Sequence, residues 1–522
     1  MGIKQFNNYE SLITFTRASG GHALRPVSYG DELVTNGTFD TDVSGWTETS
    51  ASTSVSASGV EVTTTSTDKG GIVQAVSLTV GKTYLFSVDQ SGANDAIVQL
   101  GSASFSGETY QNTAVDGSLY FSFVAQFSTT YISLRVQNAA SGQSCTFDNA
   151  SLKEVTFDQP DGTLTLFEHP ENVPRVEYDA DGNRLGLLVE EARTNLATYS
   201  VVTDANWNKS DSTINDNQLQ APNRITEAAK IVEDTDNNTH YVSLTCSGNT
   251  STTYTGSFFL KSAEREEARV RIGQAGNYVD VWVDLTDGSL GNTSTGGTGS
   301  YSASSSTDYG NGWYRVSVTG SGIGSGSEIA LRVDLGSGSE TALYTGDGSS
   351  GIYVWGAQLE AGSFPTSYIK SNSGSTTTRS ADVASIPVAD FGYNQGEGTA
   401  LVQCTLQEQT VSNLRILGGT STTRWLYANA PDDDYPIVFY DGTNNLSINL
   451  NVTSLTVKAA ISVETDSVTG SVNGSTPITR THNGNLLGIT SFEIFGNNTG
   501  YIKAIKYYPR SLTNAQLQDL TS

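Results

Sequence analysis

Short runs in which polar and apolar side chains alternate are the feature that most limits how this chain can fold. They occur, for example, at residues 83–88 and 131–136, and clusters of Gly, Asn, Asp and Ser interrupt them about every ten residues. A period of two points successive side chains to opposite faces of a strand, so the pattern predicts short antiparallel strands in β-sandwiches. Helical periodicity is nearly absent. The clearest helix is expected at residues 511–520, with Thr513 or Ser511 as its cap.

The charge balance excludes several classes of partner. The chain has 54 acidic and 28 basic residues, which gives a formal net charge of −26 over 522 residues. A nucleic-acid binder that neutralises phosphates with a basic face is therefore excluded, and attraction to anionic membranes is unfavourable. No run reaches the ~18 apolar residues that a transmembrane helix needs, so we expect no membrane insertion. The first residues lack the pattern of a secretory signal, and three cysteines in separate regions indicate neither a disulfide framework nor a zinc site.

An internal repeat organises much of the chain. In the first copy, Trp46 precedes a last strand with the sequence FDNASL at residues 147–152. In the second copy, Trp207 precedes YVWGAQL at residues 353–359. The second copy is longer, mostly because of Gly-, Ser- and Thr-rich tracts such as residues 289–306, which are typical of loops. The repeat predicts two copies of one sandwich with different loops.

The landmarks of the first copy also occur together in a known family. Phe39 and Trp46 near its start, followed by the FDNASL run at its end, form a pattern that resembles carbohydrate-binding modules of the galactose-binding-like jelly-roll type. The resemblance covers residues 31–155 well and residues 196–370 more loosely. It implies a jelly-roll fold and, with less force, sugar binding.

Three further runs form a second pattern: TFTRAS at residues 14–19, GLLVEEARTN at residues 186–195 and GAQLEAGSFPTSYI at residues 356–369. This series resembles bacteriophage virion and tail-appendage proteins. In those relatives a short connection joins the first run to the second, whereas here the jelly roll at residues 31–155 separates them. We infer that this jelly roll is inserted in a platform made by residues 1–30 and 156–195, and its ends should then be close in space.

The carboxy-terminal part, which ends in YYPRSL at residues 507–512 before the expected helix, resembles a concanavalin A-like or laminin-G-like sandwich. The predicted fold class is thus all-β, with several antiparallel β-sandwich (jelly-roll) domains in tandem and one of them inserted in an N-terminal platform. The expected segments are an attachment segment at 1–30, the inserted jelly roll at 31–155, a platform and hairpin segment at 156–195, a second jelly roll at 196–370, a linker at 371–390 and the last sandwich at 391–522.

The sequence offers no catalytic constellation. Laminarinase-like relatives of the last sandwich place their carboxylates in an ExDxxE run, and this chain has none. The triplet at residues 432–434 is acidic and stands beside two prolines, so it indicates a solvated turn or, alternatively, a structural calcium loop. Residues 179–190 match a calcium loop superficially, but Arg184 occupies the position that needs Gly, so a β-hairpin is favoured. We expect no enzyme, no catalytic residues and no cofactor beyond such a calcium ion.

Aromatic side chains carry the remaining signal, because sugars stack on Trp and Tyr while polar side chains bind their hydroxyls. Four tryptophans stand at strand or repeat positions and are expected in the core: Trp46, Trp207, Trp313 and Trp355. The candidate ligand-binding residues, for which core packing is the alternative, are Arg424, Trp425, Tyr427, Asp433 and Tyr435.

These observations predict a non-enzymatic structural protein of a phage virion, a tail fibre or similar appendage, that mediates adsorption by recognising host-surface glycan. Its expected partners are other virion proteins and host glycan, its expected assembly is a homotrimer, and its location is the virion after assembly in the host cytoplasm. One alternative is a capsid or tail decoration protein without a receptor role. Others are a bacterial extracellular polysaccharide-binding protein and a polysaccharide depolymerase.

Overall fold

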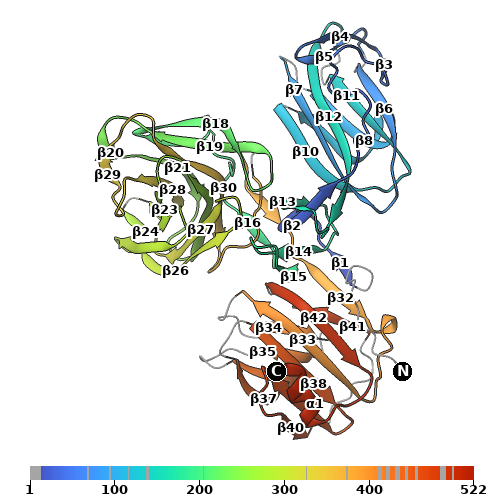
Figure 1. Cartoon of the computed structure of the whole chain (residues 1–522), viewed down its shortest axis with the longest axis vertical. Helices are drawn as coiled ribbons and strands as arrows, with labels where there is room; N and C mark the ends of the chain where they lie inside the picture. Colours follow the sequence, from blue (N-terminus) through green and yellow to red (C-terminus); the bar gives the residue numbers. More distant parts are fainter. Residues whose placement is uncertain are drawn as a thin grey trace. The chain divides into compact units, whose positions relative to one another are not determined.

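In the computed structural model the described residues are 13–522, except 68–69, 93–95, 116, 137–139, 204, 275, 325, 372–373, 408–413, 419–423, 429–434, 441–444, 453–455, 482–489 and 496–498. The prediction of an all-β protein is confirmed, because antiparallel sheets make up nearly all of the regular structure (Figure 1). Within the described residues, no helix is long and apolar enough to cross a bilayer. The chain divides into two compact units. One comprises Pro26–Thr163 and Glu168–Pro170, and the other comprises Met1–Arg25, Leu164–Phe167 and Glu171–Ser522.

The smaller unit is a sandwich of two antiparallel sheets, except that residues 21–25 and 164–167 of two of its strands belong to the larger unit. The first has the order β10 (Gly117–Val124), β7 (Thr83–Ser91), β12 (Ser144–Phe157), β2 (Gly21–Tyr29) and β13 (Thr163–His169), with β5 (Gly59–Thr64) paired to β12 and β4 (Ala51–Ser56) paired to β5. The second has the order β3 (Thr47–Thr49), β6 (Gly71–Ser77), β11 (Thr129–Val136), β8 (Ala96–Ala103) and β9 (Ser106–Val115). Strand β7 alternates half-buried and buried residues as its sequence predicts. Tyr29 lies opposite Val155, and the Gly30 amide donates to the Glu154 carbonyl over 2.9 Å, so the chain enters and leaves this sandwich at one place.

The larger unit contains the second sandwich. Its front sheet has the order β17 (Asn208–Ser210), β21 (Tyr241–Ser247), β28 (Glu328–Gly336), β23 (Glu267–Gln274), β24 (Asn277–Asp284) and β25 (Leu290–Gly296). Its back sheet has the order β18 (Ser212–Gln220), β19 (Thr226–Glu233), β30 (Gly351–Ala361), β22 (Tyr254–Ser262), β27 (Tyr314–Ser321) and β26 (Ser300–Asp308). The two-stranded pairs β20 (Asn237–Thr239) with β29 (Leu343–Thr345) and β16 (Arg193–Asn195) with β31 (Thr377–Arg379) complete it. The alternating Val, Ile and Leu residues of both sheets fill one core.

The repeat seen in the sequence corresponds to a shared backbone feature. In β12 the register shifts between Asp148 and Ser151, where Asn149 has φ +52°, and in β30 it shifts at Gly356, which has φ +64°. Both positions are β-bulges that need a left-handed backbone conformation, which Gly and Asn adopt most readily. A Cβ at Gly356 would also stand 2.5 Å from the Phe259 ring. The extra residue shifts the alternation by one position, so that Phe147, Ala150 and Leu152 are all buried, as are Val354, Ala357 and Leu359. The FDNASL and WGAQL runs therefore encode the same irregularity.

The third sandwich contains strands from distant parts of the sequence. One sheet has the order β14 (Arg175–Tyr178), β15 (Arg184–Val189), β42 (Gly500–Tyr508), β33 (Gly398–Leu406), β38 (Thr456–Val463), β39 (Ser467–Val472) and β40 (Ile478–Thr481). The other has the order β1 (Thr14–Thr16), β32 (Val383–Pro387), β41 (Ser491–Ile494), β34 (Leu414–Gly418), β35 (Arg424–Ala428), β36 (Tyr435–Tyr440) and β37 (Asn445–Val452). Phe15 and Leu187 therefore share a core with the carboxy-terminal strands. The segments expected as a platform extend this sandwich, and the expected linker contains β31, β32 and a 3-10 turn, Val388–Asp390.

Two local predictions are confirmed. Strands β14 and β15 form the favoured hairpin, whose turn is closed by the Asp179 carboxylate accepting the Asn183 amide at 2.8 Å. Helix α1 (Asn514–Thr521) begins after Thr513, which forms a capping box with Gln516, and buries Leu517.

Candidate functional site

The three sequence runs at residues 14–19, 186–195 and 356–369 meet in a buried ionic network. Arg175 donates to Asp382 at 2.5 Å and pairs with Glu190 at 2.8 Å, and Arg17 of the TFTRAS run donates to the second oxygen of Asp382 at 3.2 Å. Arg379 lies 3.5 Å from Glu190. All five side chains are at most 2% exposed. A buried charge is costly unless it is paired and hydrogen-bonded, and each of these charges has an opposite partner.

The ionisation of Glu190 follows from this pairing. Burial by itself would raise its pKa, but Arg379, Arg175 and two hydrogen bonds from Ser367 outweigh burial and lower the pKa to about 2. The hydrogen bonds come from the Ser367 amide at 2.7 Å and its hydroxyl at 2.6 Å. Glu190 is therefore a permanently charged anchor, not an acid or base that exchanges protons near neutral pH.

The GAQLEAGSFPTSYI run folds back over the outer face of the back sheet. Gln358 accepts the Ile369 amide at 2.7 Å, and Glu360 accepts both the amide of Thr366 at 3.0 Å and its hydroxyl at 2.5 Å. Gln358 and Glu360 are completely buried. Tyr368 packs on Trp355 at 4.5 Å, so polar and aromatic contacts together fix this segment on the sheet.

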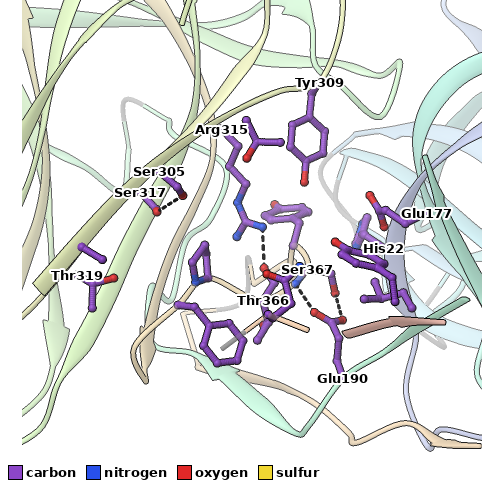
Figure 2. Close-up of a pocket in the computed structure, with 18 of the residues that line it drawn as sticks. His22, Glu177, Glu190, Ser305, Tyr309, Arg315, Ser317, Thr319, Thr366 and Ser367 are labelled. Carbon is purple, nitrogen blue, oxygen red and sulfur yellow. Dashed lines mark hydrogen bonds between the residues drawn. The ribbon is translucent and has the colours of Figure 1, made fainter. Parts of the chain in front are cut away.

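A cavity of about 360 Å³ lies beside the network (Figure 2). Glu177 and Glu190 line it from the β14–β15 hairpin, Arg315 from β27, and Tyr309 from the loop after β26. Figure 2 shows the hydroxyl of Tyr309 directed toward the space between Arg315 and Glu177. Sites that bind small molecules typically enclose about 300–1,000 Å³ and carry a few convergent polar groups.

Burial also raises the pKa of other groups that line the cavity. Burial raises the pKa of Glu177 to about 8, against the lowering effects of the Leu24 amide, which it accepts at 3.0 Å, and of Arg175. Burial likewise raises the pKa of Tyr309 to about 12, although Arg315 opposes the shift. At neutral pH, Glu177 is therefore mostly an uncharged carboxyl that can donate a hydrogen bond.

The outer face of the front sheet carries a second constellation. Cross-strand pairing places Arg271 opposite both Arg332 and Asp280, and Arg269 opposite Asp334. Arg271 donates to Asp280 at 2.9 and 2.6 Å, and Arg332 donates to Asp334 at 3.0 Å through Nε. The two carboxylates are fully buried, while the side chains of Arg271 and Arg332 remain 18% exposed. The buried carboxylates thus hold the guanidinium groups in fixed orientations at the surface.

Aromatic rings accompany these arginines. The guanidinium of Arg271 lies 3.8 Å from the ring centroid of Tyr278, and that of Arg332 lies 3.4 Å from that of Tyr241. Planar guanidinium and aromatic groups stack favourably, which stiffens both. Our sequence interpretation missed this face. The alternation in EARVRIGQ and NYVDVWVD, where all alternate residues except Gly273 are charged or aromatic, is the signal that could have identified it.

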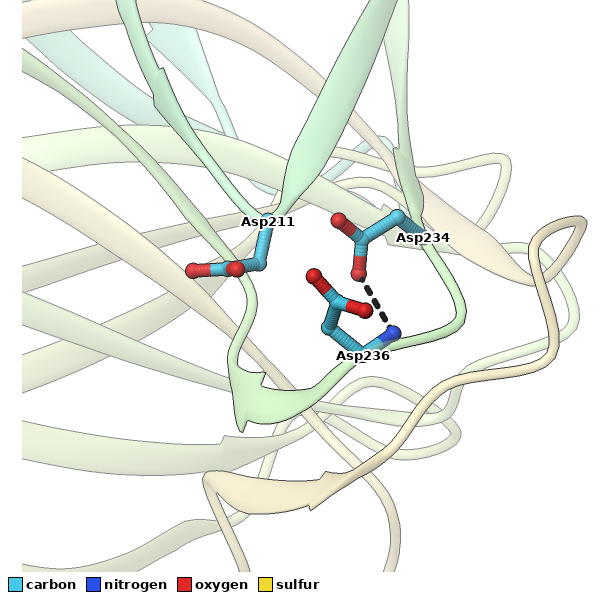
Figure 3. Close-up of side chains that lie close together, drawn as sticks. All are labelled: Asp211, Asp234 and Asp236. Carbon is cyan, nitrogen blue, oxygen red and sulfur yellow. Dashed lines mark hydrogen bonds between the residues drawn. The ribbon is translucent and has the colours of Figure 1, made fainter.

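A third cluster contains Asp211, Asp234 and Asp236, whose carboxylate oxygens lie within 4.8 Å of one another (Figure 3). Asp234 accepts the Asp236 amide at 3.0 Å, and Asp211 accepts Asn238 at 3.0 Å. Oxygen ligands of this kind suit Ca²⁺. Partly exposed carboxylates also gather at turns without an ion, so this cluster alone does not define a metal site.

The structure describes one of the two groups of residues singled out from the sequence. Trp46, Trp207, Trp313 and Trp355 are at most 8% exposed, so their assignment to the core is confirmed. The prediction of the candidate ligand residues stays untested. Arg424, Trp425 and Tyr427 lie on β35 and Tyr435 begins β36, but their side chains lie outside the described part of the structure, as does Asp433 entirely.

Comparisons with known proteins add little to this geometry. No protein-family description and no curated protein matches the chain. Among solved structures, a tandem of carbohydrate-binding modules (CBM22-1-CBM22-2) from Paenibacillus barcinonensis Xyn10C is 13% identical, covers 64% of this chain and 98% of its own, and has a TM-score of 0.21. Trypanosoma rangeli sialidase in complex with sialic acid is 10% identical, with coverages of 94% and 85% and a TM-score of 0.22. At such TM-scores these similarities carry no information on function. The chain itself is an all-β protein of antiparallel sandwiches.

Proposed function

We propose that this chain is a non-enzymatic structural protein of a bacteriophage virion, a tail fibre or similar appendage, and that it binds host-surface glycan through the front sheet of its second sandwich. The observation that carries the binding role is the row of oriented guanidinium groups and tyrosine rings around Arg271 and Arg332. Such a face offers hydrogen-bond donors for sugar hydroxyls and flat surfaces for sugar rings.

The virion role is supported by the three phage-like runs of the sequence. In the structure three of their charged residues are buried: Arg17 and Glu190 lie in the ionic network, and Glu360 holds the segment that covers the back sheet. A scaffold that joins several sandwiches by such contacts suits a particle component that presents binding faces. A homotrimer would add avidity to weak individual sites, as expected of an appendage that adsorbs to a cell.

The binding role is tested with the full chain on an array of bacterial surface polysaccharides. The variant Arg271→Lys with Arg332→Lys keeps both charges opposite their buried aspartates but loses the planar, forked donors. We expect it to bind its glycan at least about tenfold more weakly than the wild type, or about 1.4 kcal/mol. Arg480→Lys, at an exposed arginine on β40, is the matched control and should bind normally.

Two outcomes would remove this assignment. Equal binding by the double variant and the wild type would exclude the front sheet, and the absence of binding to any polysaccharide would exclude glycan recognition. Shortened polysaccharide products after incubation would show a depolymerase and overturn the non-enzymatic role. Absence of the chain from purified infectious particles would overturn the virion role, and antibodies that leave adsorption unchanged would favour decoration.

A further inference from the structure

The cavity lined by Glu177, Tyr309 and Arg315 lies on the opposite sheet from the proposed glycan face and forms no part of it. We propose that this cavity is a second, independent ligand site, which binds a sugar acid of monosaccharide size with its carboxylate against Arg315. Three features of the cavity point to this chemistry: an unmatched buried cation, neutral hydroxyl and carboxyl donors around it, and an opening at the edge of the back sheet.

Arg315 supplies the positive charge. Arg315 is only 6% exposed, and its guanidinium group donates to the Thr366 carbonyl at 2.6 Å and to the Ser257 hydroxyl at 3.1 Å. Both partners are neutral, and its Nε has no hydrogen-bond partner among the described residues. The ring of Phe259 covers one side of the guanidinium at 5.4 Å. A buried cation whose partners are all neutral is stabilised by an anion placed against its guanidinium group.

The other carboxylates of the cavity do not neutralise Arg315. Glu190 is committed to Arg175 and Arg379, and Glu177 holds its proton at neutral pH because burial raises its pKa to about 8. A carboxylate ligand would thus meet one cation and one carboxyl donor, without repulsion from a second negative charge. Ionised Glu177 would compete for Arg315 and repel that ligand.

The rest of the wall fits a sugar. Hydroxyl groups converge from neighbouring strands, including Ser305 and Ser317, which hydrogen-bond each other at 2.7 Å. Phe364 and Tyr368 add apolar and aromatic surface, which suits the C–H faces of a pyranose ring. Ala303, on the edge strand β26, lines the cavity and is exposed, so ligand can enter from solvent at this edge.

The test uses D-glucuronate and D-galacturonate as probes, with D-glucose and D-galactose as controls that replace the carboxylate by a hydroxymethyl group. Binding to the full chain is followed by saturation-transfer NMR and by calorimetry at pH 7.0 and 9.5. We expect at least one uronate to bind, with its neutral counterpart at least about tenfold weaker. Binding of neither uronate, or equal binding of the neutral sugar, would overturn the proposal.

The pH dependence gives a second readout. If only the protonated form of Glu177 admits the ligand, the apparent Kd of the uronate rises about 30-fold between pH 7.0 and 9.5. Glu177→Gln keeps the shape and a donor, so it should retain binding and lose most of this rise. The charged and titratable groups that face Glu177 in this cavity are His22, Arg175, Glu190, Tyr309, Arg315 and Tyr501. Burial holds the pKa values of both tyrosines above this pH range. A rise of the same size in Glu177→Gln would exclude Glu177 from the site.

Two variants locate the ligand without relying on a buried substitution. Ala303→Trp should obstruct the entrance and weaken uronate binding at least about tenfold, whereas Ser302→Trp, next to it on β26 but outside the lining, should not. Equal effects of the two tryptophans would refute this location. Arg332→Lys on the front sheet should leave uronate binding unchanged, so failure of the cavity proposal and failure of the glycan-face proposal are distinguished.

Discussion

Replacing Glu190 by Gln should destabilise the larger unit strongly, because it removes one negative charge from a network that contains three buried arginines. Glu190 is 2% exposed and lies 2.8 Å from Arg175 and 3.5 Å from Arg379. Breaking a buried ion pair by removing one partner typically costs about 3–5 kcal/mol. The shift in acidity gives an independent figure. The pKa falls from 4.5 to about 2, and each unit corresponds to about 1.4 kcal/mol, which gives roughly 3 kcal/mol.

The sign of the pH dependence follows from the same shift. The folded-state pKa of Glu190 is depressed, so its contribution to stability is fully present above about pH 4.5. It is lost progressively as the pH falls through about 2. The stability difference between the wild type and Glu190→Gln should therefore shrink over this range, while carboxylates elsewhere titrate equally in both proteins.

Urea unfolding followed by tryptophan fluorescence is the appropriate assay, because five of the six tryptophans belong to the larger unit. Glu191→Gln is the matched control. Glu191 is the next residue, its side chain is 35% exposed, and its partner Arg193 forms a surface pair worth about 0–1 kcal/mol. Losses within about 1 kcal/mol of each other for the two variants would refute the reasoning. So would a difference between wild type and Glu190→Gln that is constant from pH 5 to pH 2.

Three further outcomes are expected. Gly356→Ala should lower the free energy of unfolding by at least about 1 kcal/mol, because Gly356 has a positive φ and its Cβ would meet the Phe259 ring. Asn149→Gly, at the equivalent bulge, should change the free energy of unfolding by less than about 0.5 kcal/mol. Thermal unfolding of the two variants tests this difference. Thr513→Ala should cost about 1 kcal/mol through loss of the helix cap, measured by urea unfolding. Replacing residues 31–153 by a two-residue Asn-Gly turn should leave the unfolding transition of the larger unit in place, and its disappearance would contradict a self-contained insertion.

The parts of the fold that local patterning encodes were predictable from the sequence. The alternation of β7 and the cap at Thr513 depend on neighbouring residues, so they can be read from a short window. The composition of the third sandwich depends on pairing between β15 and β42, whose partners Leu188 and Tyr501 stand more than three hundred positions apart. No local pattern records such a partner. For this reason residues 179–190 could be predicted as a hairpin, while the sheet that this hairpin extends could not.

The candidate sites likewise include features that local sequence patterns encode and features that depend on distant parts of the chain. Trp355 could be placed in the core because its position in the repeat matches a strand that must bury one face. The raised pKa of Glu177 could not be foreseen, because it comes from burial in the folded chain, where the same cavity is lined by residues of β26 and β27 more than a hundred positions further along the sequence. Likewise, the sequence around Arg271 indicates only an ordinary strand residue. Its role appears only when cross-strand pairing brings Arg332 and Asp280 beside it.

The three runs at residues 14–19, 186–195 and 356–369 place charged residues in the buried scaffold of the larger unit. Arg17, Glu190 and Glu360 recur in those runs, and in this chain all three are buried and satisfied by protein partners. These three side chains cannot contact a receptor without breaking the fold, so at these positions the runs serve the scaffold of this chain. Under the proposed function, glycan binding would depend on residues outside the three runs, such as Arg271 on the front sheet, whereas the proposed cavity site combines Arg315 with Phe364 and Tyr368 of the run at residues 356–369. Substitutions at Arg271 should change glycan binding more than global stability, whereas substitutions in the buried network should do the reverse.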